Sequence, residues 1–244
     1  MSEPAPPSPS PALRELHVWQ DMAFRSAAEN MALDEALLGW TLASGAAAIR
    51  LYHWDHPACT FGYFDRSGHR DDFTAPGPVR RFTGGGLVEH GEDLTFALTL
   101  PAPSDLARAD TAKRYRTIHE ALAHALVDAG VSTSPVQPDL GASPGPCFQN
   151  PVPWDLVDPI SGRKLAGGAQ RRSRGAVLHQ GSVRLPAGLR APDAPWIPGF
   201  LLRLAESVPP LDGTLRDRLL VESRDLVATR YGHAAWNAGI REIG

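Results

Sequence analysis

The run RRFTGGGLVEHGEDLTFALTL, from Arg80 to Leu100, is the stretch that decides the fold prediction. Two arginines and a threonine lead into three consecutive glycines, and a pattern typical of a strand begins at Leu94. Because glycine weakens a strand and packs no side chain, three in a row indicate that a ligand or another backbone approaches closely. The run therefore predicts a loop that cradles a phosphate-bearing or extended acyl ligand. A glycine-rich hairpin with solvated arginines is the alternative.

A second small and basic segment, RKLAGGAQRR, runs from Arg163 to Arg172 and leads into GAVLHQGSV. The chain has 24 Lys and Arg residues, and only Lys113 and Lys164 are lysines. A lysine kept in so arginine-rich a chain indicates a need for a compact ammonium, which acts as a point charge where a planar guanidinium does not fit. We therefore predict that Lys164 contacts a ligand, whereas Lys113 lies on the solvated face of a helix.

Together the two segments resemble the catalytic domain of lipoate-protein ligases and octanoyltransferases, which is related to biotin protein ligases. NMALDEAL (30–37) and IRLYHW (49–54), followed by FGYF (61–64), resemble the same family in the same order, so the resemblance spans roughly residues 15 to 230. It implies an α+β (α/β) fold, like that of class II aminoacyl-tRNA synthetases and the biotin/lipoate ligase catalytic domain, with a mixed, mostly antiparallel sheet flanked by helices.

Local signals predict the same mixture of elements. A capping box of Ser26 and Glu29 begins a helix that runs to about Thr41. Further helices are expected over 111–129, with Gly130 at its end, and over 214–231. Two strands are expected within 47–64, and strands joined by turns over 154–185. We expect residues 1–14 to be a disordered proline-rich leader and 15–244 to be a single catalytic domain without an accessory C-terminal domain.

Composition excludes several other classes of protein. The net charge of −3 argues against nucleic-acid binding, and no apolar stretch is long enough to span a membrane. Cys59 and Cys147 form no disulfide framework, so a cytoplasmic location is expected. His119 and His124 are five apart and therefore on different helical faces, so we expect no metal site.

Cys147 lies in GPCFQNP (145–151), a loop with few apolar neighbours to bury a thiol. Nearby positive charge would favour its nucleophilic thiolate. In the family that the chain resembles, a cysteine in a Cys-Phe-x-x-Pro context typifies the transferase branch, where it carries the acyl group as a thioester. An incidental loop thiol is the alternative, whereas Cys59 is expected to belong to the core.

The resemblance implies an octanoyl-[acyl-carrier-protein]:protein N-octanoyltransferase of lipoate biosynthesis that needs no cofactor. The octanoyl or lipoyl group would pass from an acyl carrier protein, or from a lipoylated protein, to a lysine of a lipoyl-domain protein. Glycine-cleavage H protein and the E2 subunit of 2-oxoacid dehydrogenases are examples of the acceptor. The alternatives are an ATP- and Mg-dependent lipoate-protein ligase and a non-catalytic lipoyl-domain binder. The expected catalytic residues are Cys147 and Lys164, and the expected substrate-binding residues are Arg80, Arg81, Thr83, Gly84, Gly85, Gly86, His90, Gly167, Gly168, Ala169 and Gln170.

The chain departs from the family's usual pattern at two places. His90 is followed by Gly91 and not by an acidic residue. Gln180 occupies a position where the family usually has histidine, and His179 stands one place earlier. Because neighbouring residues in a strand point to opposite faces, a general-base role for His179 is doubtful. His90 has a structural role as its alternative.

Overall fold

The computed structural model describes residues 11–65, 77–137 and 151–238, and a seven-stranded sheet forms its centre. The strand order is β2-β3-β7-β11-β10-β9-β8, in which only β2 and β3 run parallel to each other. The strands are β2 (His17–Arg25), β3 (Ala48–Trp54), β7 (Leu94–Leu100), β8 (Ser134–Pro135), β9 (Leu156–Val157), β10 (Lys164–Ser173) and β11 (Ala176–Val183). The predicted mixed, mostly antiparallel sheet is therefore confirmed.

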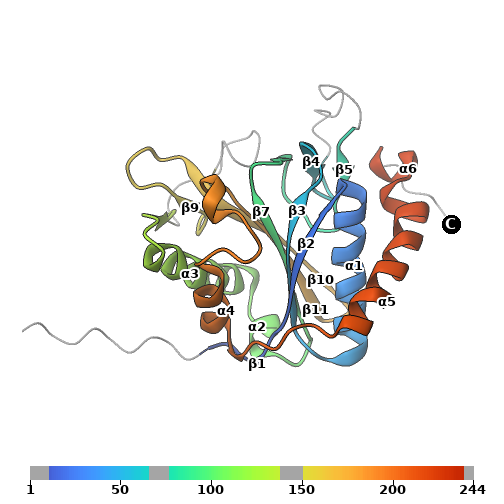
Figure 1. The fold of residues 1–244 in the computed structure, drawn as a ribbon, viewed down its shortest axis with the longest axis horizontal. Helices are drawn as coiled ribbons and strands as arrows, with labels where there is room; N and C mark the ends of the chain where they lie inside the picture. Colours follow the sequence, from blue (N-terminus) through green and yellow to red (C-terminus); the bar gives the residue numbers. More distant parts are fainter. Residues whose placement is uncertain (1–10, 66–76, 138–150, 239–244) are drawn as a thin grey trace, which may run out of the picture.

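Helices cover both faces of this sheet, as Figure 1 shows. On one face lie α1 (Ala27–Ser44) and α5 (Gly213–Leu226); on the other lie α3 (Thr111–Asp128) and α4 (Ile197–Leu204). Every residue of β7 is buried because this strand is covered from both sides. Leu94, Phe96 and Leu98 pack toward α3 and α4, while Ala97 packs with residues of α1. The two faces of this strand therefore belong to two different apolar layers.

Smaller elements complete the fold. A three-stranded sheet has the order β5-β4-β6, with β4 (Ala58–Phe61), β5 (Val79–Arg80) and β6 (Val88–His90). The remaining elements are β1 (Leu13–Glu15), β12 (Ala205–Ser207), α2 (Asp105–Arg108), a 3-10 turn (Ala187–Leu189), a π-helical turn (Val227–Tyr231) and α6 (Ala234–Asn237). None of the helices in the described ranges combines the length and apolar character needed to cross a bilayer.

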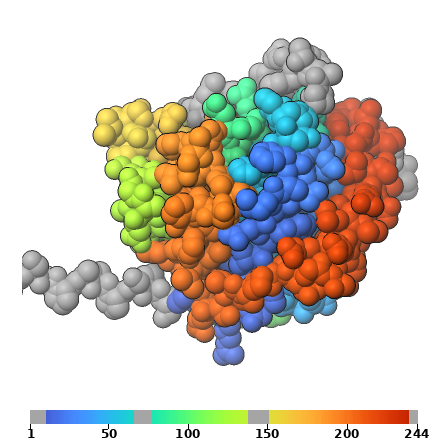
Figure 2. Space-filling model, in the orientation of Figure 1, coloured from blue at the N-terminus to red at the C-terminus, as the bar shows by residue number. Residues whose placement is uncertain are grey.

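The folded domain begins earlier in the chain than the sequence analysis predicted, at β1. Leu13 pairs with Ala205 in the parallel β1–β12 ladder, so Leu13 and Arg14 belong to the folded domain and not to the leader. Val18 of β2 then exchanges backbone hydrogen bonds with Pro209 and Leu211. Figure 2 shows the blue surface of β2 beside the orange to red surface of this C-terminal region. Both strand pairings bring sequence-distant segments together, which local patterns do not reveal.

The predicted helix boundaries are close to the observed ones where a cap defines them. The Ser26 hydroxyl accepts a hydrogen bond from the Glu29 N–H, and the Glu29 carboxylate accepts one from the Ser26 N–H, which completes the capping box. The helix ends three residues later than predicted, at Ser44, where Gly45 adopts a φ of 72°. Gly130 follows α3 with a φ of 81°, as a residue ending a helix in the left-handed region should.

Candidate functional site

A pocket of about 500 Å³ lies where β10 and β11 face the small β5-β4-β6 sheet, and it brings the two glycine-rich segments together. Seven of the predicted site residues line the pocket: Arg81, Gly85, His90, Lys164, Gly167, Gly168 and Ala169. Residues that the sequence analysis did not place in a site line it too, among them Met31, Tyr52, Trp54, Thr95, Gln180 and Ser182.

Lys164 is the first residue of β10, and its side chain is only 6% exposed. Its ammonium Nζ lies 2.7 Å from Oδ2 of the fully buried Asp155. A Cβ on Gly167 would lie 2.3 Å from Cε of Lys164, so the lysine lies across the strand in the space that a side chain at residue 167 would need. The glycine in this second motif therefore makes room for the lysine.

Asp155 connects Lys164 with the neighbouring backbone. The carboxylate also accepts hydrogen bonds from the Tyr115 hydroxyl at 2.5 Å and from the Val152 N–H at 2.7 Å. The Tyr115 hydroxyl in turn accepts a hydrogen bond from the Gly168 N–H at 2.7 Å. Buried charges are stable only when they are paired and hydrogen-bonded, and this arrangement satisfies that requirement. The sequence did not mark Asp155 or Tyr115, because the hydrogen bonds of Tyr115 with Asp155 and with Gly168 join distant segments.

The glycine loop opposite Lys164 is held by Arg81, which is 5% exposed. Its guanidinium donates to the carbonyl oxygens of Gly84, at 2.7 Å from Nη2, and Gly86, at 2.8 Å. Gly85 has a φ of 87°, which side-chain-bearing residues rarely adopt. A Cβ on Gly62 would lie 1.9 Å from the Gly85 carbonyl oxygen, so two backbone segments touch here. The alternative of a hairpin with solvated arginines is therefore wrong.

Arg80 has a different environment from its neighbour. Its guanidinium lies between the rings of Tyr63 and Trp236, at 4.5 and 4.0 Å from their centroids. The Trp236 indole N–H also donates to the Arg80 carbonyl oxygen at 2.7 Å. Arg80 is buried and is not among the residues that line the pocket. It stabilises the packing of α6 against β5, and the structure does not bring it together with the other predicted site residues.

His90 forms one wall of the pocket together with Trp54, on which its ring stacks at a centroid distance of 3.9 Å. Its Nδ1 lies 2.7 Å from Oδ2 of Asp93, and its Nε2 lies 2.9 Å from the Thr60 hydroxyl. Burial opposes ionisation of Asp93, but His90 and the hydrogen bond from Ser182 outweigh it and lower the pKa of Asp93 to about 2. Because both ring nitrogens are engaged, His90 fixes the wall of the pocket.

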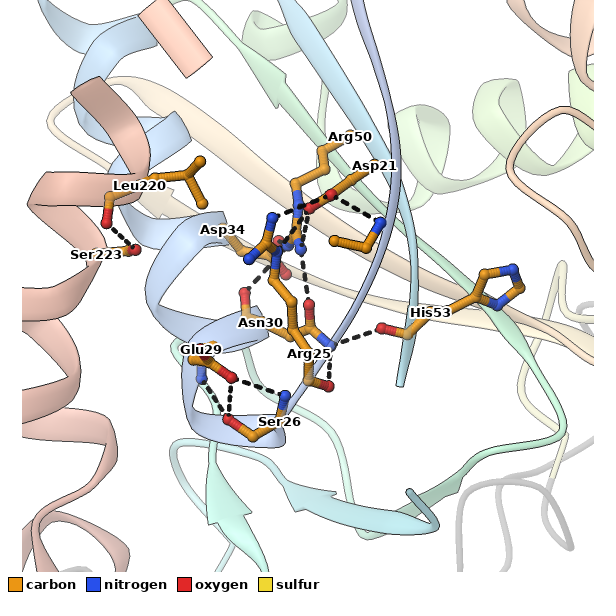
Figure 3. A network of polar contacts seen from close by, with 11 residues as sticks. Asp21, Arg25, Ser26, Glu29, Asn30, Asp34, Arg50, His53, Leu220 and Ser223 are labelled. Atoms are coloured by element: carbon orange, nitrogen blue, oxygen red, sulfur yellow. Dashed lines mark hydrogen bonds and ion pairs between the residues drawn. The ribbon is translucent and has the colours of Figure 1, made fainter. Parts of the chain in front are cut away.

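Gln180 connects the glycine loop to a buried ionic network. Its Nε2 donates to Oδ2 of Asp34 at 2.6 Å, and its Oε1 accepts from the Thr83 hydroxyl at 2.6 Å. Figure 3 shows this network, in which the fully buried Arg50 lies between the carboxylates of Asp21 and Asp34. The Arg50 guanidinium lies 3.1 Å from Oδ1 of Asp34 and 2.8 Å from Oδ2 of Asp21. Thr83 thus belongs to the site through Gln180.

The two carboxylates of this network respond differently to burial. Burial raises the pKa of Asp34 and outweighs the lowering effect of Arg50. Burial acts in the same direction on Asp21, but Arg50 and Arg25 outweigh it and lower the pKa of that carboxyl group. The network therefore depends on all three charges.

His179 faces away from the pocket, as the strand geometry predicted. Its ring stacks against Phe96 and lies 5.6 Å from that of Tyr115. Burial lowers the pKa of His179 well below its ordinary value, and neither ring nitrogen has a hydrogen-bond partner among the described residues. Gln170, a predicted substrate-binding residue, accepts a hydrogen bond from Nε of Arg114 at 2.7 Å and does not line the pocket. Gln170 is therefore not brought together with Lys164.

Of the two cysteines, Cys59 lies within the described residues and Cys147 lies outside them. Cys59 is 7% exposed, which confirms its assignment to the core, and burial together with the nearby Glu89 raises the pKa of its thiol to about 12. His119 of the rejected zinc motif stacks on Tyr115 at 4.0 Å. Within the described ranges, no three His, Cys, Asp or Glu side chains gather as metal ligands.

Comparison with known proteins agrees with this geometry. The sequence profile of the family described as the lipoyl protein ligase A/B catalytic domain matches residues 26–191. "Octanoyltransferase LipM" of Kyrpidia tusciae is 35% identical over 173 residues, which cover 66% of this chain and 62% of that protein. "Octanoyltransferase LipM" of Halalkalibacterium halodurans is 32% identical over 187 residues, which cover 70% and 67%. The chain thus spans about two thirds of the length of these curated relatives.

Solved structures match the fold over nearly the whole chain. A putative lipoate protein ligase from T. acidophilum has a TM-score of 0.74 at 21% identity and covers 92% of this chain and 99% of its own. A lipoate-protein ligase A bound with ATP has a TM-score of 0.71 at 19% identity and covers 93% and 100%. These structures confirm the predicted lipoate-ligase fold, and with the profile match over residues 26–191 it follows that the chain belongs to the lipoyl protein ligase A/B catalytic domain family.

Proposed function

We propose that the protein is an acyltransferase that moves an octanoyl group from an acyl carrier protein thioester to a lysine of a lipoyl-domain protein. The observation that carries the proposal is the similarity to proteins named "Octanoyltransferase LipM", up to 35% identical, in a chain that has Cys147 ahead of Lys164. Glycine-cleavage H protein and the E2 subunit of a 2-oxoacid dehydrogenase are suitable acceptors. The reaction requires no ATP and no other cofactor.

The reaction proceeds in two acyl transfers at Cys147. The Cys147 thiolate attacks the carbonyl carbon of the octanoyl thioester; a new C–S bond forms, and the carrier leaves as a thiolate that takes up a proton. A neutral lysine amine of the lipoyl domain then attacks the acyl-enzyme. The amide bond forms, the amine loses its proton, and the Cys147 thiolate is regenerated. Because the acyl group waits on the enzyme, the two carrier proteins need not bind at the same time.

Lys164 stabilises the negative charge that develops on the carbonyl oxygen in both steps. Its ammonium lines the pocket, and Asp155 holds it in a water-poor environment, where a fixed charge is most effective. Val152 is five positions after Cys147, so an extended chain keeps their Cα atoms within about 18 Å. The Val152 N–H donates to the same Asp155 oxygen that pairs with Lys164. Chain length therefore permits the thiol to reach Lys164.

The test is transfer in the absence of ATP. The protein is mixed with octanoyl acyl carrier protein and an apo lipoyl domain, and each protein is weighed by intact-mass spectrometry. We expect octanoylated lipoyl domain and, without acceptor, an octanoyl adduct on Cys147. C147A should abolish both, whereas the matched C59A variant should retain both because Cys59 is buried.

Two other results would replace the proposal. A strict ATP requirement, with transfer unaffected by C147A, would identify an ATP-dependent ligase in which Lys164 neutralises an adenylate phosphate. Binding of the lipoyl domain without any acyl transfer, with or without ATP, would identify a non-catalytic lipoyl-domain binder.

A further inference from the structure

We infer that Gln180 is a positioning residue that holds the glycine loop of the acyl pocket by joining Thr83 to the buried Asp34–Arg50 pair. The inference rests on the proposed function, in which this pocket receives the acyl group. It assigns to Gln180 a role in the reaction without contact with the reacting atoms.

The amide of Gln180 is held by two partners on opposite sides. The side chain is 7% exposed, and both hydrogen bonds, to Asp34 and from Thr83, are 2.6 Å long. An ionised carboxylate only accepts hydrogen bonds, so Nε2 must face Asp34 and Oε1 must face the Thr83 hydroxyl. The amide is thus fixed in one orientation, with its donor group directed at Asp34 and not at a bound acyl group.

The far end of this connection cannot move easily. Besides Gln180, the Asp34 carboxylate accepts from the Tyr52 hydroxyl at 2.8 Å and from the Arg50 guanidinium at 3.1 Å. Arg50 donates in addition to Asp21 and to Asn30. Asp34 and Arg50 are both completely buried, so their positions are set by the core of the molecule. Through its hydrogen bond with Thr83, Gln180 therefore anchors the beginning of the glycine loop to this fixed position.

The near end is the loop itself. Thr83 is fully buried and directly precedes Gly84, Gly85 and Gly86, which have no side chains of their own to hold them. Arg81 binds two carbonyl oxygens of the loop from one side, and the Thr83–Gln180 hydrogen bond fixes its beginning from the other. Without the second contact, the glycines keep the backbone freedom that makes them costly to order.

The charged groups around residue 180 define how a substitution there should respond to pH. From α1 the Asp34 carboxylate touches it directly, and from β3 Arg50 and Tyr52 act through Asp34. Lys164 of β10, Arg81 and His90 of β6 line the same pocket. Of these groups, Asp34 is the one whose hydrogen bond to Gln180 depends on its charge.

The decisive variant is Q180E. When ionised, the introduced side chain would place a second carboxylate against Asp34; when the two carboxylates share a proton, both hydrogen bonds of Gln180 are reproduced. Relative to wild type, kcat/KM for octanoyl transfer by Q180E should therefore be roughly ten- to a hundredfold lower at pH 8 and should recover as the pH falls toward 6. Q180M, which loses both bonds at every pH, should show the same loss without recovery.

Two controls separate positioning from folding. Q20E adds the same charge at an exposed position of β2, and its ratio to wild type should not change with pH. T83V should match Q180M, and T83S, which keeps the hydroxyl, should restore activity. All rates are expressed per folded molecule, which is determined by thermal unfolding.

Binding of free octanoate, followed by the change in intrinsic tryptophan fluorescence to which Trp54 in the pocket contributes, gives a second readout that does not need transfer. Q180E affinity should follow the same pH trend as its activity. If wild type transfers octanoate or binds it and the Q180E ratio stays constant with pH, the role of Gln180 is refuted while the proposed function stands. If wild type binds octanoate with the predicted Q180E trend but transfers nothing, only the proposed function is refuted. If wild type neither transfers nor binds octanoate, both are refuted.

Discussion

Replacing Asp34 by asparagine should destabilise the protein far more than the loss of one surface charge would. Asp34 is completely buried and accepts hydrogen bonds from Arg50, Tyr52 and Gln180. Asparagine has the same size but only one acceptor oxygen, so its NH₂ group must face a donor on one side. Removing one partner of a buried ion pair costs about 3–5 kcal/mol, because the remaining charge stays buried and poorly compensated.

Urea unfolding measures this cost directly. For a chain of this size the dependence of the unfolding free energy on urea is about 3 kcal/mol per molar, so D34N should lower the unfolding midpoint by about 1–2 M. E120Q is the matched control, because Glu120 and Arg116 form a surface pair whose side chains are 42% and 54% exposed. Such a pair contributes about 0.3–0.5 kcal/mol, so its midpoint should move by less than about 0.2 M.

The result that would refute this reasoning is a D34N midpoint within about 0.3 M of wild type, since that corresponds to less than about 1 kcal/mol. It would mean that Arg50 is satisfied by Asp21 alone. A large shift with unchanged transfer activity per folded molecule would keep the energetic argument but would separate the ionic network from the glycine loop.

Three further predictions concern the walls of the pocket. The pKa of Asp93 is lowered from 3.8 to about 2, so its ionisation stabilises the fold above about pH 4. This contribution, of about 2 kcal/mol, is lost as the pH falls toward 2. D93N should therefore be less stable than wild type at pH 7, and its urea midpoint should fall less than that of wild type between pH 5 and pH 2. G62A should lower the melting temperature strongly because the new Cβ would collide with the Gly85 carbonyl oxygen, whereas G84A, with nothing within 4 Å of its Cβ, should change it little, and equal melting temperatures would contradict the close approach. K164R should keep the charge but lower kcat/KM for transfer by about a hundredfold or more, because a rigid guanidinium does not fold across Gly167 as the ammonium does; full activity of K164R would show that only the charge matters.

The sequence predicted the elements whose signals are local. The capping box at Ser26 and the left-handed residue at Gly130 each depend on a few neighbouring residues, and both were found. The helix α4 was missed because no side chain caps its beginning and it is only eight residues long. Leu13 and Arg14 of β1 were assigned to the leader because the partner strand β12 lies almost two hundred residues later in the chain.

The candidate site was predictable only in part, for the same reason. Glycines and a rare lysine mark Gly167 and Lys164 in the sequence, and the structure shows that the two depend on each other. The residues that hold them are not marked, because Tyr115 reaches Gly168 across 53 positions and Gln180 reaches Asp34 across 146. An aspartate or a glutamine in a strand pattern looks like any other polar residue until its partner is known.

Arg80 and Arg81 show why a motif does not determine the role of each of its residues. The sequence presents them as a pair of cations before the glycines, but adjacent residues in an extended segment point in opposite directions. Arg81 therefore reaches the glycine carbonyl oxygens, while Arg80 reaches Tyr63 and Trp236. Trp236, which holds the Arg80 guanidinium, belongs to α6, and α6 follows Arg80 by more than one hundred and fifty residues, so local sequence does not reveal this contact. A cation in a ligand-binding motif can therefore have a structural role when aromatic rings of the protein enclose it, as the rings of Tyr63 and Trp236 enclose the Arg80 guanidinium.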